Sequence, residues 1–216
     1  MRAVLDACVL YPTVLREILT DAAGAGLFQP VWSQRILDEW RHAATRQNLD
    51  AGVEIALTTA RFPQAMTAAD ADARGLDLPD PADRHVVEAA MAAGADQIVT
   101  ANLRDFPRGA LASVGLSAVH PDEFLRELFL QAPGPVLAAI ARAEARARAA
   151  GGAMTRKELM RRARLPRLAK AIARLDAGAD HGPEPGPEPG PEPGPEPGPE
   201  PGPEPRADPA SGPQSH

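Results

Sequence analysis

Apolar positions along the chain follow two spacings, one typical of buried strands and one typical of amphipathic helices. Short apolar runs predict strands at Arg2–Leu10, ending near Asp6, at Gln97–Thr100 and at Leu116–Val119. Apolar residues at helical spacing predict helices over residues 13–24, 34–47, 81–93 and 121–130, and one or two helices over 51–74, broken at Pro63. Strands that alternate with helices imply a parallel sheet covered on both faces.

The carboxy-terminal part of the chain has a different pattern. Residues 136–176 are rich in alanine and arginine and predict about three helices, with breaks at Gly151–Gly152 and at Pro166. Thr155 and Glu158 form a capping-box pattern at the start of one of these helices. Residues 182–205 repeat Gly-Pro-Glu-Pro six times, a composition that cannot bury apolar surface and predicts disorder. We therefore expect a domain over 1–132, a basic helical extension over 133–178 and a disordered acidic tail over 179–216.

Charge is distributed unevenly along the chain. The net charge is −6, yet residues 142–174 hold eleven basic side chains and two acidic ones. This asymmetry favours a polyanionic partner such as a nucleic acid, and we expect Arg156, Lys157, Arg161 and Arg162 to contact its phosphates. The alternatives are docking of this segment onto the acidic core or onto a partner protein, or a plain solvated helix.

The cysteine count and the apolar runs bear on the compartment. A single cysteine, Cys8, rules out a disulfide framework and a cysteine-based zinc site, and it fits a reducing cytosol. It lies in the first apolar run, where a small buried side chain in a strand is the simplest interpretation. No apolar stretch reaches the ~18 residues that a membrane span needs. We expect a soluble cytoplasmic protein without a membrane partner.

Four acidic residues lie where a parallel sheet forms its sites, at the carboxyl ends of strands or on the helices around them. They are Asp6, Glu39, Asp83 and Asp105. A hydrated Mg²⁺ or Mn²⁺ takes carboxylate oxygens from several directions while it keeps water ligands. Taken singly, each acid is more simply a helix cap or a solvated charge.

Four sequence strings change that interpretation. They are AVLDACV at residues 3–9, ILDEW at 36–40, DPADRHVVEAA at 80–90 and IVTANLRDFP at 98–107. In their order and spacing they resemble the PIN domain, in particular PIN ribonucleases of the VapC-like toxin type with a helical carboxy-terminal extension. The resemblance covers about residues 1–130. It implies a three-layer α/β/α fold with a central parallel sheet.

The resemblance also implies an activity, which is Mg²⁺- or Mn²⁺-dependent endonucleolytic cleavage of RNA. The products would carry 5′-phosphate and 3′-hydroxyl ends. A cognate antitoxin would regulate the enzyme, which makes this chain the toxin of a type II toxin–antitoxin pair. Small domains of this kind often form dimers, so a homodimer is one expected assembly.

Matched position by position, the resemblance assigns roles to particular residues. Asp6, Asp83 and Asp105 are the expected metal ligands, and Glu39 is a further ligand or the group that orients or deprotonates the attacking water. Thr100 and Asn102 match polar positions at the end of the strand before Asp105. Asp80 is a lesser candidate, because an aspartate before Pro81 is also an ordinary helix cap.

Other functions and other polar residues were weighed against this interpretation. A receiver domain needs a lysine after its strand-end acids, and residues 1–141 contain none. A PIN nuclease that matures RNA outside a toxin–antitoxin pair, and a non-catalytic interaction module with the same fold, remain alternatives. His85 follows Asp83 and could face the site, but a helix-surface position is favoured. Trp32 and Trp40 are expected in the core rather than stacked on bases.

Overall fold

The computed structural model of the chain describes residues 1–151 and 154–180, with side chains described as far as Ala177. The expected tail therefore lies outside the described residues from His181 onward. The boundary that we expect between a domain and an extension, at 132/133, stays a prediction. Among the described residues, no helix has the length and the apolar composition needed to cross a membrane.

Five parallel strands form one sheet, in the order β3-β2-β1-β4-β5. The strands are β1 (Arg2–Leu5), β2 (Gln29–Ser33), β3 (Met66–Thr67), β4 (Gln97–Val99) and β5 (Ser117–Val119). The sequence patterns predicted β1, β4 and β5 but neither β2 nor β3. Pro30 lies inside β2, opposite Ala3 of β1, and proline within a run is a signal against a strand.

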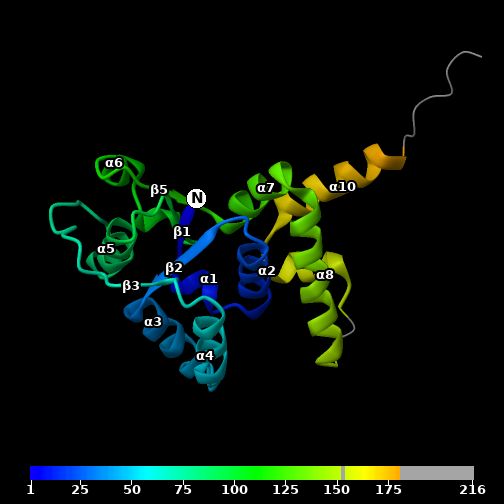
Figure 1. Cartoon of the computed structure of the whole chain (residues 1–216), viewed down its shortest axis with the longest axis horizontal. Helices are drawn as coiled ribbons and strands as arrows, with labels where there is room; N and C mark the ends of the chain where they lie inside the picture. Colours follow the sequence, from blue (N-terminus) through cyan, green and yellow to red (C-terminus); the bar gives the residue numbers. More distant parts are fainter. Residues whose placement is uncertain (152–153, 181–216) are drawn as a thin grey trace, which may run out of the picture. The chain divides into compact units, whose positions relative to one another are not determined.

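Helices cover both faces of this sheet. In chain order they are α1 (Ala7–Leu10), α2 (Thr13–Gly24), α3 (Gln34–Thr45), α4 (Gly52–Arg61), η1 (Pro81–Asp83), α5 (Arg84–Ala92), η2 (Leu103–Asp105), α6 (Arg108–Ala112), α7 (Pro121–Gln131), α8 (Pro133–Ala149), α9 (Arg156–Arg162) and α10 (Pro166–Asp180). Figure 1 shows α5 and α6 on one side of the strands, and α2, α7 and α8 on the other. The predicted three-layer α/β/α fold is confirmed.

Two local expectations differ from the structure. Helix over residues 51–74 is confined to α4, and the chain after Pro63 instead adds the two residues of β3 to the edge of the sheet. Cys8 lies in the short helix α1 rather than in the first strand. The strand ends at Leu5 because Asp6 begins this helix, with Val9 and Leu10 both donating their backbone N–H to the Asp6 carbonyl.

The core lies between the sheet and its two helical layers. The side chains of β1 and β4, such as Val4, Leu5 and Ile98, are fully buried. Trp32 and Trp40 are also buried, as predicted, and Phe62 packs edge-on against Trp32 with ring centroids 6.0 Å apart. Fixed strands and buried anchors of this kind hold the carboxyl ends of the strands in place.

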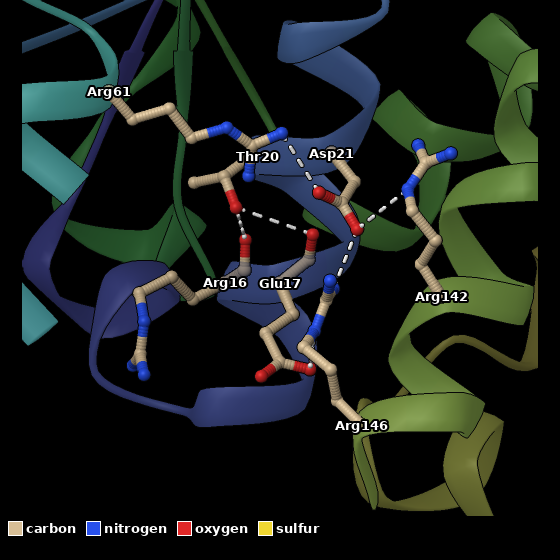
Figure 2. Close-up of polar contacts among 7 residues, drawn as sticks. All are labelled: Arg16, Glu17, Thr20, Asp21, Arg61, Arg142 and Arg146. Atoms are coloured by element: carbon tan, nitrogen blue, oxygen red, sulfur yellow. Dashed lines mark hydrogen bonds and ion pairs between the residues drawn. The ribbon is translucent and has the colours of Figure 1, made fainter. Parts of the chain in front are cut away.

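A buried carboxylate ties α8 to α2. Asp21 lies in α2 with a side chain that is 2% exposed, and Figure 2 shows three guanidinium groups directed at it. Arg61 of α4 lies 2.9 Å from one carboxylate oxygen, while Arg142 and Arg146 of α8 lie 3.2 and 2.6 Å from the other. The charges of three helices therefore meet at one side chain.

A second aspartate fixes the last helix. Asp122, in the first turn of α7, is buried, and its carboxylate accepts hydrogen bonds from the backbone N–H groups of Arg167 at 2.9 Å and Leu168 at 3.0 Å. These are free donors at the start of α10, so a residue of α7 caps the N-terminus of α10. In α9 the predicted capping box of Thr155 and Glu158 is present with both of its arms.

Candidate functional site

The order in which strands are added to the sheet reverses between β1 and β4. From β1 the chain moves outward to β2 and β3 and then returns to β4 and β5 on the other side. Ligand sites of open parallel sheets form outside the carboxyl ends of the strands at such a switch point. Asp6 directly follows β1 and Thr100 directly follows β4, and the Asp6 backbone N–H donates to the carbonyl of Val99 at 3.2 Å. The sequence thus places both residues where the topology predicts a site.

Asp6 is held at one of its carboxylate oxygens. The Thr100 hydroxyl donates to Asp6 Oδ2 at 2.7 Å, and the Cys8 thiol donates to the same oxygen at 3.1 Å. Burial, and secondly the charge of Asp6, raise the pKa of Cys8 to about 12, so the thiol keeps the hydrogen that it donates. Within the described part of the chain, Asp6 Oδ1 accepts no hydrogen bond and remains available to a ligand.

The loop after β4 brings two more predicted residues to the same edge. The backbone N–H of Asn102 donates to the Thr100 hydroxyl at 3.1 Å, and the Asn102 side-chain amide donates to Asp105 Oδ2. Asp105 lies in η2 and is half-buried. Thr100 and Asn102 therefore orient Asp6 and Asp105, respectively, which is a positioning role.

Asp83 has the clearest electrostatic signature in the cluster. Its pKa is raised to about 6, first because burial disfavours the charged form and then because neighbouring carboxylates repel it. Those carboxylates belong to Asp6, Asp105, Asp80 and Glu39. The other three predicted acids, Asp6, Asp105 and Glu39, therefore lie within electrostatic range of Asp83. Asp80 itself caps η1, with Oδ1 accepting from the Ala82 N–H at 2.8 Å, as expected for an aspartate before proline.

Glu39 reaches the cluster from α3, where it lies beside His85 of α5 and Arg35 of its own helix. Ser33 caps α3 by accepting from the Ile36 N–H, which starts the helix directly after β2. His85 Nε2 lies 2.8 Å from Glu39 Oε1, and the histidine is 3% exposed. The surface position that the sequence favoured for His85 is therefore wrong. Ala89, one helical turn further along α5, is also fully buried, so the buried face of that helix is wider than its apolar stripe indicates.

The donor set suits a hard divalent cation. Carboxylate oxygens surround Asp83, and no arginine or lysine is among the main causes of its pKa shift. Neighbouring carboxylates repel one another, and a divalent cation relieves that repulsion. Within residues 1–151 and 154–180, however, no three His, Cys, Asp or Glu side chains are grouped closely enough to hold a metal ion as they stand. The acids thus fit the metal in their chemistry, while the assignment of ligands stays a prediction.

The predicted RNA-binding residues lie on α9. Lys157, Arg161 and Arg162 are exposed. Arg156 is engaged instead in an ion pair, with Nε 2.8 Å from Glu144 Oε1 of α8. The first three remain free to meet a phosphate, whereas Arg156 helps to join α9 to α8.

Comparison with known proteins agrees with this geometry. Residues 2–104 match the PIN domain family. The chain is also 51% identical over 43 residues to a Mycobacterium tuberculosis protein named "Putative ribonuclease VapC50", a match that covers 20% of this chain and 25% of that protein. The chain thus matches about a quarter of the length of this relative. No solved structure matches significantly. The matched region contains β1 to β4, with Asp6, Glu39 and Asp83. Residues 2–104 of this chain therefore resemble a PIN domain, and part of the chain is similar to a VapC-like protein.

Proposed function

We propose that this chain is a metal-dependent endoribonuclease that hydrolyses RNA phosphodiester bonds. The observation that carries the proposal is the position of these carboxylates at the switch point of a PIN-like fold, where Asp6 follows β1 and its charge, with that of Asp105, raises the pKa of the partly buried Asp83. Strongly perturbed carboxylates in such positions are typical of functional sites. The name of the relative supports RNA as the substrate.

The proposed roles follow from the contacts. Asp6 Oδ1, Asp83 and Asp105 are the proposed ligands of Mg²⁺ or Mn²⁺. When bound, such an ion lowers the pKa of a coordinated water and offsets the negative charge of the phosphodiester. Glu39, whose Oε1 lies 2.8 Å from His85 Nε2, is proposed to accept the proton of the attacking water. Thr100 and Asn102 keep Asp6 and Asp105 oriented.

The test is RNA cleavage by the purified chain with Mg²⁺ or Mn²⁺, with EDTA, and by the variant Asp83→Asn. We expect cleavage only with metal and only by the wild-type protein. Asp77→Asn is the matched control, because this substitution removes the same charge from an exposed residue of the preceding loop. The metal should also raise the melting temperature of the wild type but not of Asp83→Asn. Cleavage by Asp83→Asn at the wild-type rate would overturn the site assignment.

The toxin role is a separate part of the proposal, together with an antitoxin partner. Its support is the similarity to a VapC-like protein and an exposed apolar surface at α4. Leu49, Val53 and Leu57 are 59, 65 and 66% exposed, and Val53 and Leu57 are one helical turn apart. Exposed apolar groups of this kind are typical of protein contacts. The test is co-purification with the product of the adjacent reading frame, which Leu57→Glu should weaken without loss of RNA cleavage. A nuclease outside such a pair would show cleavage but no such partner.

A further inference from the structure

The turn between α9 and α10 concentrates positive charge. Residues 161–167 contain four arginines and no acidic residue. Lys170 and Arg174 follow Arg167 at spacings of three and seven residues, so the three side chains share one face of α10, and all three are exposed. The turn and the start of α10 therefore present a continuous run of cationic groups.

This turn is attached firmly to the PIN fold. Leu165 and Leu168 are both fully buried. The Asp122 carboxylate binds the backbone N–H groups of Arg167 and Leu168 at 2.9 and 3.0 Å. Arg167 also lies 3.2 Å from Glu123 of α7. The position of the turn is thus set by the first turn of α7, directly after β5.

The start of α7 lies at the same edge of the sheet as the acidic cluster. The Thr100 N–H donates to the carbonyl of Val119 at 3.0 Å, and the Asp6 N–H donates to that of Val99. Asp6, Thr100 and His120 therefore follow one another across β1, β4 and β5. Neighbouring strands are about 4.8 Å apart, so the backbones of Asp6 and His120 are separated by roughly 10 Å. The arginine-rich turn lies beyond His120, on the β5 side of the cluster.

The electrostatics of His120 support this placement independently. The pKa of His120 is lowered, mainly by burial. The charge of Asp122 raises this pKa, whereas the positive charges of Arg167 and Arg164 lower it further. Both guanidinium groups therefore lie within electrostatic reach of the residue that ends β5.

The two arginines are available to a ligand. Arg164 is exposed, and within the described residues its guanidinium makes no hydrogen bond or ion pair. The backbone of Arg164 has a φ of 57°, a left-handed conformation that residues other than glycine and asparagine rarely adopt. The ion pair of Arg167 with Glu123 is at the surface, where its side chain is 66% exposed, and such pairs exchange readily for a stronger partner.

We propose that Arg164 and Arg167 bind the phosphate backbone of the RNA substrate on the β5 side of the acidic cluster. This inference rests on the proposed function. A cluster of carboxylates repels a polyanion, so affinity must come from cations beside it. Contacts with phosphates also fix where the chain of nucleotides lies relative to the cleavage site. The proposal moves the main RNA contact from the face of α9 to the turn that follows it.

The test compares RNA binding by full-length variants in EDTA, as fluorescence anisotropy across a salt series. The double variant R164Q/R167Q removes both cations, and R46Q/R148Q instead removes two exposed arginines, one directly after α3 and one on α8. Single-stranded RNA loses about 0.7 in the slope of log K against log salt for each phosphate contact that is lost. We expect a slope reduced by about 1.4 and at least a tenfold weaker affinity at low salt for R164Q/R167Q, with R46Q/R148Q within twofold of wild type.

Arg164→Gly separates binding from folding. Glycine adopts a positive φ freely, so we expect a melting temperature equal to or above that of the wild type together with weaker RNA binding. If the wild type cleaves RNA but R164Q/R167Q and Arg164→Gly both bind RNA with the affinity and salt dependence of the wild type, this inference is overturned. The turn would then be a candidate contact for an acidic protein segment. Absence of RNA cleavage by the wild type with either metal would overturn the proposed function instead, so the two failures are distinguishable.

Discussion

Replacing Asp21 with asparagine tests how strongly α8 is held to the PIN fold. The substitution keeps the shape of the side chain but removes the charge that faces Arg61, Arg142 and Arg146 (Figure 2). Burial alone would raise the pKa of Asp21, but the hydrogen bonds from the arginines, first Arg146, outweigh it and lower the pKa. The ionised form is therefore the one that stabilises the fold.

The magnitude follows from the exposure of the four groups. A hydrogen bond to a charged group contributes about 1.5–3 kcal/mol, and removing one partner of a buried pair costs about 3–5 kcal/mol. The Asp21 side chain is 2% exposed, but those of the arginines are 42–47% exposed, so water replaces part of what they lose. We expect Asp21→Asn to lower the free energy of unfolding by about 2–3 kcal/mol, and the melting temperature by roughly 4–12 °C.

Urea denaturation followed by tryptophan fluorescence measures this loss, because Trp32 and Trp40 are buried in the folded chain. Asp38→Asn is the control. Asp38 pairs with Arg41 at 2.6 Å, but its side chain is 43% exposed, and we expect a loss of only about 0.3–0.5 kcal/mol.

The pH dependence gives a second readout. The contribution of a carboxyl group with a lowered pKa is complete above the pKa of the unfolded chain, about 3.9, and is lost as the pH falls through the folded value. The difference between wild type and Asp21→Asn should therefore be constant from pH 7 to 5 and shrink below pH 4. A variant no less stable than Asp38→Asn, or a difference independent of pH, would refute the reasoning.

Three further predictions concern single residues. Asp83→Asn should raise the melting temperature of the metal-free protein at pH 7.5. This gain should shrink as the pH falls from 6 to 4, because the wild-type carboxyl with a pKa of about 6 then becomes neutral. An equal gain at pH 4 and 8 would contradict this. Asp122→Ala should cost about 1–2 kcal/mol and speed amide hydrogen exchange in the first turn of α10, where it removes the cap; unchanged exchange would exclude the capping role. Cys8, with a pKa of about 12, should react with a thiol reagent at pH 8 only after unfolding, which rapid labelling of the native protein would disprove.

Local signals in the sequence predicted several elements well. The helix over residues 81–93 was expected from the spacing of Val86, Val87 and Ala90, and all three are fully buried. Pro121 begins α7 as predicted, and the capping box of α9 is present. Each of these signals acts within one or two turns of chain, so it can be interpreted without knowledge of the tertiary fold.

Features that depend on distant parts of the chain could not be predicted in the same way. The two residues of β3 have almost no pattern of their own and form a strand because the edge of β2 is free to pair with them. The cap of α10 comes from Asp122, 45 residues before Arg167. Asp21 and Arg146 are 125 residues apart. No local pattern links such partners.

Part of the candidate site could be predicted from the sequence, and part depends on contacts that no local pattern indicates. Asp6 and Thr100 could be placed together because the carboxyl ends of parallel strands meet at one edge. The burial of His85 could not be predicted, because the apolar residues Val86, Val87 and Ala90 indicate a narrower stripe on α5 than the face that is buried, which includes both His85 and Ala89. Alanine is too small for its pattern alone to indicate how wide the buried face of a helix is.

The cap that Asp122 provides also sets an order of events during synthesis. The residue before α10 is Leu165, whose side chain cannot accept a hydrogen bond, so the helix lacks a cap from its own sequence. Its first turn is completed only when β5 and the start of α7 are already in place. Because a ribosome makes residues 117–131 before residues 166–180, the chain can assemble the sheet first and add α10 last. The cationic turn therefore reaches its place beside the acidic cluster only once the sheet has formed, so an incompletely folded chain would not present the surface that we propose for phosphate binding.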